Sequence, residues 1–465
     1  MLKIFNTLTG KKEVFKPIFH NKIDMYVCGV TVYDLCHIGH GRTFICFDII
    51  VRYLRYIGYE VQYVRNITDI DDKIIDLSNK NKESIKNFTR RMISHMHNDF
   101  FKLNILTPNQ EPRATKYISY MIDIISKLLD LKHAYISMNG DVMFSIASDS
   151  NYGILSKQFI EKLQSTSRIK INQSKKNDVF DFVLWKISKK NEPYWVSPWG
   201  NGRPGWHIEC SAMSKAILGN SFDIHGGGSD LLFPHHENEI SQSTCVNSVS
   251  YANYWIHTGI VIVNNKKMSK SLGNVYTLQE ILKNYHAEVI RYLLISTHYR
   301  HPLYFSKKSL KNAEISLLIL YRALRGTNFK KIIDNNSSIA LDFKKSMNDD
   351  FNTPDILSKF LNIAHKINIY KMKNNNQEAD RLASELYYFG NILGLFLSHP
   401  EDFFYKNNQY NNQDIMKIEY LIKQRNDARK LKFWIKADKI RNYLLELGIM
   451  LEDSADNTIW YKIKK

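Results

Sequence analysis

The first seventy residues change their hydrophobic period twice, and this predicts a strand, a helix and a second strand. Residues 25–33 (MYVCGVTVY) are apolar, β-branched and aromatic without a break, which is typical of a buried strand. From His37 the apolar residues recur at three- and four-residue steps until Gly58, which acts as a helix stop. Residues 60–68 (EVQYVRNIT) resume strand character. This βαβ pattern predicts an α/β fold with a parallel sheet.

The middle of the chain predicts an insertion into that first domain. Residues 83–133 are expected to be helical, and the Asn139-Gly140 pair that follows predicts a hairpin. Residues 150–205 are polar and rich in Trp, Pro and Gly, which suggests an insertion. Apolar strands and glycine loops are expected to return at 206–265, so that the interrupted domain is completed there.

The last third of the chain has a helical pattern. Apolar stripes at helical spacing begin at about residue 305. Residues 399–414 (HPEDFFYKNNQYNNQD) are interpreted as a linker, and a small module rich in lysine and arginine closes the chain. No internal repeat is visible.

Composition indicates a folded protein with free thiols. Hydrophobic residues make up 44% of the 465 positions, which supports packed cores and excludes a disordered chain. The five cysteines are scattered and form no disulfide framework, which favours a reducing compartment. No secretory signal begins the chain, and no apolar stretch approaches the roughly 18 residues needed to cross a bilayer. We therefore expect a cytoplasmic protein.

The charge balance favours a polyanionic partner. Lysine and arginine total 64 and aspartate and glutamate 46, which gives a formal net charge of +18. A nucleic acid would suit such a surface. The alternative is a codon bias towards lysine, asparagine and isoleucine, which raises the charge without a function.

The segment His37-Ile38-Gly39-His40 has the chemistry of a phosphate site. The two histidines are three apart at a predicted helix start, so they share a face. Unpaired N–H groups and the helix dipole attract anions there, and Gly39 lets another group approach the backbone. The alternative is that both histidines only cap the helix.

Residues 266–274 (KKMSKSLGN) form a polar loop that ends in a glycine. Lys267 and Lys270 could swing onto a polyphosphate and balance the charge that grows on it. Without the rest of the sequence, a solvated basic loop is the better explanation of these residues.

A metal site is suggested by soft and hard donors in two further stretches. Cys210 lies in GRPGWHIECSAMS, and FDIHGGGSDLLFPHHENE holds His225, His235, His236 and Glu239. His235 and Glu239 are four apart, so a helix would bring both to one point. Thiolate, imidazole and carboxylate all suit Zn²⁺. The alternative is an ordinary buried cysteine beside helix histidines.

The order of these motifs resembles that of a known enzyme class. HIGH in the first crossover and KMSKS some 230 residues later resemble the class I aminoacyl-tRNA synthetases. The stretches MYVCGVTVYDLCHIGHGR, NITDIDDKI, GRPGWHIECSAM, GGGSDLLFPHHENE, KMSKSLGN and DFNTP are similar to those of the cysteinyl-tRNA synthetase family, bacterial type. They span residues 25–354, and RNDARKLKFWIKAD extends the likeness into the tail.

The resemblance implies a role for particular residues. It implies zinc ligands at Cys28, Cys210, His235 and Glu239. It implies that His37, His40, Lys267 and Lys270 act on ATP, which Mg²⁺ accompanies, with Lys270 the stronger contact. It implies a nucleotide side that includes Gly39, the loop at Gly226 and Gly227, and Asp230, although Asp230 could also be a helix cap. Trp206 and His225 are expected to wall the pocket, and an ordinary core role for Trp206 stays open.

The implied activity is the ligation of L-cysteine to its transfer RNA in two steps. ATP-dependent formation of cysteinyl-adenylate precedes transfer to the terminal ribose of the RNA, and zinc selects the cysteine thiolate over the serine hydroxyl. No editing domain is then needed. Because two thiolates and a carboxylate leave the site negative, we expect Glu239 to bind weakly or to shift when cysteine arrives. The protein is expected to be a monomer.

The resemblance also implies a domain order. We expect a Rossmann-type catalytic domain in two halves with an insertion, then a stem-contact region, a helical bundle and an anticodon-binding module. The expected ranges are 1–118, 119–200, 201–250, 251–308, 309–400 and 401–465. In the last range Arg429, Trp434, Asp438 and Asp453 match positions that the family uses near the anticodon. A surface helix with one packed Trp is the alternative.

Other functions stay open on sequence alone. A related ligase that joins cysteine to an amino-sugar shares the catalytic core, but the 150 or so residues after position 310 argue against it. A non-catalytic zinc protein that binds RNA would have no reason to keep both HIGH and KMSKS. A dinucleotide-binding oxidoreductase would show G-x-G-x-x-G after the first strand, and none follows.

Overall fold

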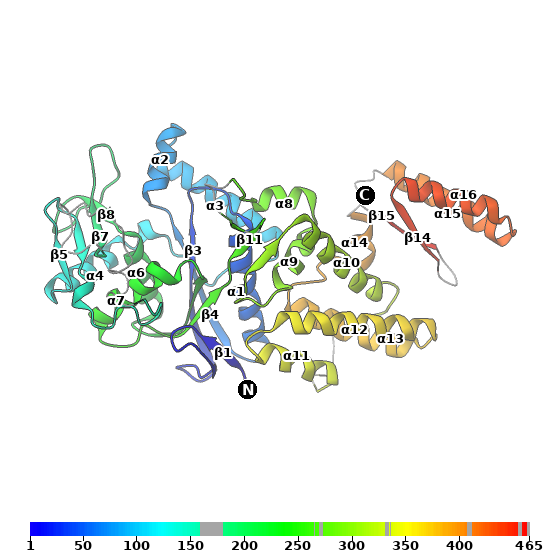
Figure 1. Ribbon diagram of the computed structural model, residues 1–465, viewed down its shortest axis with the longest axis horizontal. Helices are drawn as coiled ribbons and strands as arrows, with labels where there is room; N and C mark the ends of the chain where they lie inside the picture. The colour runs from blue at the N-terminus through cyan, green and yellow to red at the C-terminus, as the bar shows by residue number, and fades with distance from the viewer. Residues whose placement is uncertain are drawn as a thin grey trace.

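A four-stranded parallel sheet forms the centre of the molecule (Figure 1). The computed structural model describes residues 1–158, 180–264, 266–268, 273–330, 334, 336–406, 412–453 and 458–462. The strand order is β10 (Ala252–Thr258), β9 (Phe222–Gly228), β3 (Lys22–Thr31) and β4 (Glu60–Thr68). Helix α1 (Ile38–Tyr56) crosses over from β3 to β4, so the predicted βαβ unit is confirmed.

Burial explains why this unit forms where the hydrophobic period predicts it. Strand β3 is buried along most of its length, and the apolar residues of α1 lie in the same hydrophobic core. Gly58 adopts a positive φ of 101° just after the helix, which suits a residue without a Cβ. Strand β4 occupies the predicted range without a shift.

Two short strands and two helices complete the first part of the chain. They are β1 (Lys3–Asn6), β2 (Lys11–Val14), α2 (Asp72–Lys80) and α3 (Ile85–Lys102), followed by the short turn η1 (Ala114–Lys116). The helical prediction for 83–133 is wrong between 103 and 117. Prolines at 108 and 112 interrupt a helix there, and the backbone N–H of Asn109 instead donates to the carbonyl of Tyr63 at 2.8 Å.

The insertion is a small antiparallel sheet beside a helix, on the left of Figure 1. Its elements are α4 (Ile118–Asp130), β5 (Ala134–Ile136), β6 (Val142–Phe144), η2 (Ile146–Ser148), β7 (Phe182–Ile187) and β8 (Gly202–Pro204). The predicted hairpin is confirmed, since β5 and β6 pair antiparallel around Gly140, whose φ is 88°. Residues 159–179 of the predicted insertion lie outside the described residues.

The return to the central sheet begins with a helix. Helix α6 (Trp206–Leu218) occupies the first part of the range where strands were expected, so that prediction is wrong there. Its sequence has no β-branched run, it contains good helix formers such as Ala and Met, and Gly219 ends it. After β9 come the short helical turn η3 (Leu232–His236) and α7 (Glu237–Asn247), which lead into β10.

Helices dominate the rest of the chain, as predicted from residue 305 onwards. A three-stranded sheet of β11 (Val261–Val263), β12 (Lys266–Lys267) and β13 (Leu303–Phe305) lies at the start of this part, with the first two helices between β12 and β13 in the chain. The helices of this part are α8 (Leu278–Asn284), α9 (Ala287–Ile295), α10 (Lys307–Leu324), α11 (Ser338–Asn348), α12 (Thr353–Met372) and α13 (Asn376–Ile392).

The predicted linker contains a helix. Helix α14 (Pro400–Lys406) lies inside the range 399–414, so the interpretation of this whole range as a linker is wrong. The buried Phe403 ring stacks on the ring of Tyr321 in α10, with 3.8 Å between ring centroids. This aromatic contact anchors α14 to the helical bundle.

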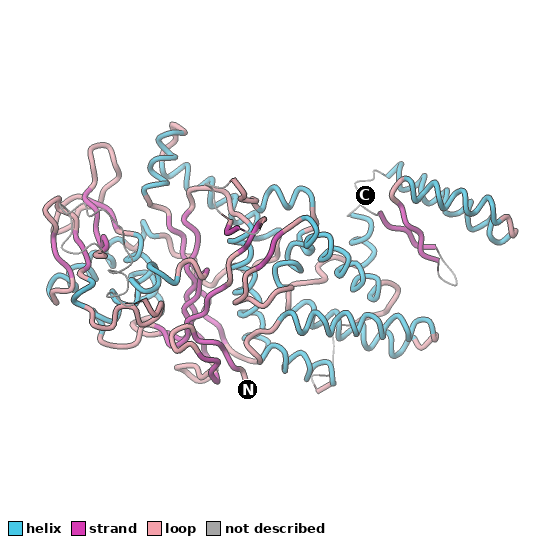
Figure 2. The backbone as a smooth tube through the Cα atoms, viewed as in Figure 1, coloured by secondary structure: helices cyan, strands magenta, loops and turns pink. Residues whose placement is uncertain are grey.

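The last module is a helical hairpin with a two-stranded sheet, at the far right of Figures 1 and 2. It comprises α15 (Asn412–Lys430), α16 (Trp434–Glu446), β14 (Ile449–Asp453) and β15 (Thr458–Lys462). A small core of its own includes Ile418, Leu444 and Trp460. No helix among the described residues combines the length and apolarity that a membrane span requires.

Candidate functional site

The carboxyl ends of the parallel strands open into a cleft of about 390 Å³. Ligands of open α/β sheets bind at this edge because the loops that follow the strands converge there. Side chains from β3, α1, α6 and the loops after β9 and β12 meet around the space. Those that bear on the predicted site are Cys28, His37, His40, Trp206, Asp230 and Met268.

The HIGH segment forms the start of α1 on one side of the cleft. His37 is the N-cap, and its Nδ1 accepts from the backbone N–H of His40 at 3.4 Å. The Nδ1 of His40 accepts from the backbone N–H of His37 at 3.2 Å, and the two rings stack with centroids 3.8 Å apart. The histidines therefore do cap the helix, and the cap also holds both rings against the cleft.

Gly39 lets the KMSKS segment approach this helix start. A Cβ at Gly39 would lie 3.0 Å from the His37 ring and 3.3 Å from the Met268 methyl. Lys267 ends the short strand β12, whose backbone pairs with Ile262 of β11. Lys270 lies outside the described residues.

The three glycines that were expected to form a loop are the last residues of β9, and with the turn that follows they divide into a buried part and a part that faces the cleft. Gly226 and Gly227 are buried in β9, where a Cβ would collide with the Phe47 ring or the His236 ring respectively. Gly228 and Asp230 line the cleft, and a Cβ at Gly228 would collide with the Asp230 carboxylate. Close packing thus explains these glycines, and Asp230 is the group of this loop that can reach a ligand.

Four buried side chains bring their donor atoms together at the inner end of the cleft. Cys28, Cys210, His235 and Glu239 come from β3, α6, η3 and α7, and their donor atoms all lie within 4.8 Å of one another. The Cys28 and Cys210 sulfurs are 3.7 Å apart, and the Cys210 sulfur is 3.6 Å from His235 Nε2. Glu239 Oε1 is 3.4 Å from the Cys28 sulfur and 3.1 Å from His235 Nε2.

These spacings fit a tetrahedral zinc ion. Zn–S bonds of about 2.3 Å and Zn–N or Zn–O bonds of about 2.0–2.2 Å place the ligand atoms of a tetrahedron about 3.3–3.8 Å apart. The four separations of 3.7, 3.6, 3.4 and 3.1 Å lie in or close to that range. Two sulfurs, one imidazole and one carboxylate also form a donor set that zinc prefers.

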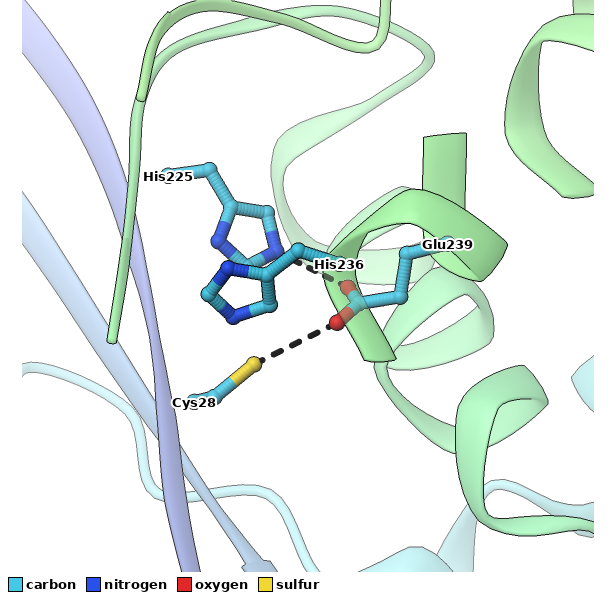
Figure 3. Close-up of side chains that lie close together, drawn as sticks. All are labelled: Cys28, His225, His236 and Glu239. Carbon is cyan, nitrogen blue, oxygen red and sulfur yellow. Dashed lines mark hydrogen bonds and ion pairs between the residues drawn. The ribbon is translucent and has the colours of Figure 1, made fainter. Parts of the chain in front are cut away.

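A second group of donors overlaps the first. Cys28, His225, His236 and Glu239 also converge, with Cys28 on its strand and Glu239 on its helix as Figure 3 shows. His225 Nε2 already contacts Glu239 Oε2 at 2.8 Å, and His236 Nδ1 contacts His257 Nε2 at 2.8 Å. Because the first group offers two sulfurs, its donor set suits zinc better.

Electrostatics keep charge on two of the four buried donors, Glu239 and Cys210, whereas burial raises the pKa of the Cys28 thiol. Burial would raise the pKa of the Glu239 carboxyl, but His225 and His235 hold it well below its usual range. Burial likewise acts to raise the pKa of the Cys210 thiol, yet the thiol of Cys28 and the His235 ring lower it to about 6. The chain thus assembles a carboxylate and a thiolate at one point, which is the electrostatic environment of a cation site.

Neighbouring groups fix the orientation of the donors. The Tyr251 hydroxyl donates to Glu239 Oε2 at 3.1 Å, on the oxygen that His225 also contacts, so Oε1 is left towards the sulfurs. His235 Nδ1 contacts His207 Nδ1 at 2.8 Å, which directs Nε2 to the cluster. Sequence reasoning missed Tyr251 and His207, because only the folded chain brings them beside the donors.

Trp206 and His225 take different places relative to the cleft. Trp206 lines the cleft and is 40% exposed. The centroid of its ring lies 4.2 Å from the centroid of the His235 ring. His225 is fully buried behind Glu239 and stacks on Trp255, with centroids 4.4 Å apart. Trp206 can therefore contact a ligand, whereas His225 acts on the carboxylate of Glu239.

A further buried network beside the cluster was missed by sequence reasoning. The Thr68 hydroxyl, at the end of β4, donates to Glu209 Oε2 at 2.8 Å, and Glu209 precedes Cys210 on α6. On the neighbouring strand the Gly29 N–H donates to Asn66 Oδ1 at 2.7 Å. The position of Thr68 at the carboxyl end of a predicted parallel strand was the available signal.

The C-terminal module carries the residues expected near an anticodon. Asp453 accepts from both Nη atoms of Arg425 at 2.6 Å, and Arg429 forms an ion pair with it at 2.7 Å. Trp434 is 56% exposed at the start of α16, in a hollow that it shares with Phe433 and three lysines. Asp438 lies one helical turn further on. Exposed aromatic and basic groups of this kind suit unstacked bases.

Comparisons with known proteins agree with this geometry. The family model for the tRNA synthetases class I (C) catalytic domain matches residues 14–315, and the DALR domain matches residues 342–397. A cysteine–tRNA ligase of Buchnera aphidicola is 56% identical over 465 residues and covers 100% of both chains. A cysteine–tRNA ligase of Haemophilus influenzae is 54% identical over 463 residues, which cover 99% of this chain and 100% of the relative.

Solved structures show the same fold at much lower identity. A Mycobacterium tuberculosis methionyl-tRNA synthetase bound by methionyl-adenylate aligns with a TM-score of 0.57 and 12% identity, over 80% of this chain and 90% of that one. This likeness bears on the fold alone. The full-length relatives and the catalytic-domain match show more, and the chain belongs to the cysteine–tRNA ligase family of class I tRNA synthetases.

Proposed function

We propose that this protein ligates L-cysteine to its cognate tRNA at the expense of ATP. The observation that carries the proposal is the shared cleft. Cys28 of the sulfur cluster and both histidines of HIGH line one space, so a thiol-bearing amino acid and a nucleotide can meet in it. The names of the full-length relatives support the same activity.

The amino-acid side of the proposal uses the four buried donors. Cys28, Cys210, His235 and Glu239 would hold zinc. When bound, zinc supplies a soft Lewis acid that prefers a substrate thiolate to a hydroxyl, which stays protonated at neutral pH. His225 and Tyr251 anchor Glu239 through Oε2. The carboxylate would therefore make room for cysteine by a pivot about Oε2 that moves Oε1 away from the zinc position.

The nucleotide side of the proposal uses the start of α1. His37 and His40 would contact the ATP phosphates, and the N-terminal N–H groups and dipole of α1 favour that negative charge. Lys267 and Lys270 would balance the charge of the departing pyrophosphate, with Mg²⁺ accompanying the ATP. Asp230 would accept from ribose hydroxyls, and Gly39 would allow close approach of the nucleotide. Gly226 and Gly227 would serve the nucleotide side indirectly, by allowing β9 to pack closely behind the cleft.

The RNA side of the proposal uses the second half of the chain. The ranges 309–400 and 401–465 would bind tRNA, with Arg429, Trp434, Asp438 and Asp453 near the anticodon. The catalytic halves at 1–118 and 201–250, the insertion at 119–200 and the stem-contact region at 251–308 complete the proposed domain order. The five cysteines form no disulfide, which supports a cytoplasmic location for the protein. We further propose a monomer, and light scattering of the purified protein tests its subunit number.

Amino-acid activation tests the proposal. Cysteine-dependent exchange of pyrophosphate into ATP should be at least about 100-fold faster than serine-dependent exchange, because a hydroxyl is a poor ligand for zinc. Charging of total tRNA with labelled cysteine should follow. Serine exchange within about tenfold of cysteine exchange would contradict selection by the metal. Exchange without any charging would instead favour the amino-sugar ligase.

A further inference from the structure

The loop between α9 and β13, residues 296–301, packs directly behind one wall of the cleft, and we call it the brace loop. The backbone N–H of Gly259, which lines the cleft after β10, donates to the carbonyl of Tyr299 at 2.7 Å. A Cβ at Gly259 would lie 2.3 Å from the carbonyl oxygen of His301, so no side chain fits between the wall and the loop. Because the two backbones are in direct contact, a shift of the brace loop would move this wall.

The wall that the brace loop supports belongs to the nucleotide side of the cleft. It consists of residues 258–261, all of which line the cleft. At one end, the carbonyl of Thr258 accepts at 2.8 Å from the backbone of the turn that carries Asp230. At the other end, the carbonyl of Val261 accepts from the backbone N–H of Met268 in the KMSKS segment at 3.3 Å. An ATP molecule that reaches from Asp230 to the KMSKS segment would therefore lie along these residues.

A buried carboxylate from the helical bundle holds the brace loop. Asp350 is 0% exposed and lies between α11 and α12. Its Oδ1 accepts from the Tyr299 hydroxyl at 2.7 Å, and its Oδ2 accepts from Arg300 Nε at 2.8 Å. Oδ1 also accepts from the backbone N–H of Phe5 in β1 at 2.9 Å. This single side chain thus connects the brace loop with the N-terminal strand and the helical bundle.

The helix that carries HIGH holds the same loop. Arg42 follows His40 by two residues on α1 and is 1% exposed. Its Nη2 donates to the carbonyl of Thr297 at 3.0 Å and to that of His298 at 2.7 Å. The brace loop is therefore fixed between the helix start that would bind the phosphates and the carboxylate of Asp350.

The backbone at Asp350 indicates that its position is imposed by the surroundings. Asp350 has a φ of 61° and Phe351 a φ of 54°, a left-handed conformation that residues with a large side chain rarely adopt. The backbone N–H of Asp350 donates to the carbonyl of Lys3 at 2.9 Å, and the Phe351 ring lies 6.4 Å from the Tyr299 ring between centroids. Two consecutive residues persist in this conformation only where the contacts around them hold them there.

We propose that Asp350 is a positioning residue for ATP, which acts through the brace loop on the wall at residues 258–261. This inference rests on the proposed function, since it assumes that ATP occupies the cleft. Asp350 does not itself line the cleft, so it would touch neither substrate. Loss of its charge should loosen the nucleotide wall and leave the zinc cluster intact, because the four donors of that cluster come from other elements.

Asp350→Asn tests the proposal. The variant replaces one carboxylate oxygen with an amide nitrogen that cannot accept from Arg300 or Tyr299, and asparagine still tolerates the left-handed backbone. We expect the KM for ATP in cysteine-dependent pyrophosphate exchange to rise about tenfold, because a displaced wall misaligns the nucleotide. The KM for cysteine and the zinc content should stay at the wild-type values. Calorimetry with ATP alone should show binding about tenfold weaker. A merely structural role would instead lower kcat through loss of active enzyme and leave both KM values unchanged.

A second variant breaks the same contact from the loop. Arg300→Ala should raise the KM for ATP about as much as Asp350→Asn does, and the double variant should show no further rise, because both changes remove one ion pair. The Arg300 side chain is 30% exposed, so this variant tests the contact even if Asp350→Asn does not fold. Asp349→Asn is the matched control, since this neighbouring carboxylate is exposed and pairs with Lys12 at 2.6 Å.

The outcomes separate the two proposals. An unchanged KM for ATP in Arg300→Ala and Asp350→Asn, a fall in kcat alone, or an equal effect of Asp349→Asn would each overturn the positioning role of Asp350. A wild-type protein without cysteine-dependent exchange would instead refute the proposed function.

Discussion

The two sides of the cleft hold their chemical groups in different ways. On the metal side, four donors come from four separate elements and are at most 4% exposed. On the phosphate side, His37 and His40 come from one helix start and are only half-buried, and Lys267 ends a strand of two residues. Under the proposed function this difference makes sense, because a substrate sulfur would be recognised by fixed spacing, whereas departing phosphates would need contacts that can move.

The largest effect is expected from a substitution that removes a donor from the metal side and leaves the phosphate side intact. Cys210→Ala removes one of two sulfurs, and we expect loss of zinc and a fall in cysteine-dependent exchange of at least about 1,000-fold, since three donors no longer close the site. Metal analysis of the purified variant measures the first effect and pyrophosphate exchange the second. Cys245→Ala is the control, because this thiol lies on α7 beyond Glu239 but outside the cluster. Stoichiometric zinc in Cys210→Ala would contradict the assignment.

The phosphate side can be broken with the metal left in place. His40→Ala should lower kcat/KM for ATP in the exchange reaction about 100-fold, since a preorganised contact to the phosphates is lost. It should also cost about 1 kcal/mol of stability, because the backbone N–H of His37 loses its partner in the cap. Zinc content should not change. His365→Ala, on an exposed position of α12, is the control. If His40→Ala lost as much zinc as Cys210→Ala, the two sides of the cleft would not be independent.

A smaller effect is expected where a residue acts on the metal side through a ligand. His225→Ala leaves the four donors intact but frees Glu239 Oε2 from its contact at 2.8 Å. Loss of zinc to a chelator should become about tenfold faster, as is typical when a group behind a metal ligand is removed. Tyr251→Phe removes only the hydroxyl that donates to the same Glu239 oxygen, Oε2, and should have a weaker effect in the same direction. An unchanged rate in His225→Ala would show that the carboxylate needs no anchor.

The same contrast explains which parts could be predicted from the sequence. Periodicity is a local signal, so β4 and α1 were predicted almost to the residue, and the spacing of His235 and Glu239 was enough to place both on one face. The contact of Cys28 with Cys210 joins residues 182 positions apart. No local pattern encodes that contact, and only the resemblance to a family suggested it.

The errors also have physical causes. Helix α14 was read as a linker because its surroundings are rich in Asn and Tyr, yet its Phe403 ring stacks on Tyr321 of the bundle. Helix α6 lies in a range where strands and glycine loops were expected, but its residues are helix formers and Gly219 ends it. In both cases a tertiary contact or a cap outweighed the composition. His225 was expected at the pocket wall, but nothing in the sequence shows that Glu239 stands in front of it.

The smallest effect concerns two buried carboxyls, one on each side of the cleft. Glu239 has histidine and tyrosine partners, whereas neither oxygen of Asp99 on α3 has a hydrogen-bond partner among the described residues. Asp99 acts electrostatically on Cys36, the residue before His37, so it lies beneath the phosphate side. Burial raises the pKa of Asp99 to about 6, against the weaker effect of Lys102.

The sign of the resulting pH dependence follows from that pKa. An unfolded aspartate has a pKa of about 3.9, so between about pH 4 and 6 the unfolded chain releases a proton that folded Asp99 keeps, and stability falls as the pH rises. Asp99→Asn removes this titration. The variant should therefore gain stability relative to the wild type, with the difference in the free energy of unfolding (variant minus wild type) increasing by about 1 kcal/mol from pH 5 to pH 8 in urea denaturation. Asp76→Asn, an exposed position on α2, should show no such trend. If the difference between Asp99→Asn and the wild type were constant over this range, Asp99 would have to be ionised in the folded chain. The charged form of Asp99 beneath the phosphate side would then be stabilised in the folded chain, as the charged form of Glu239 is on the metal side.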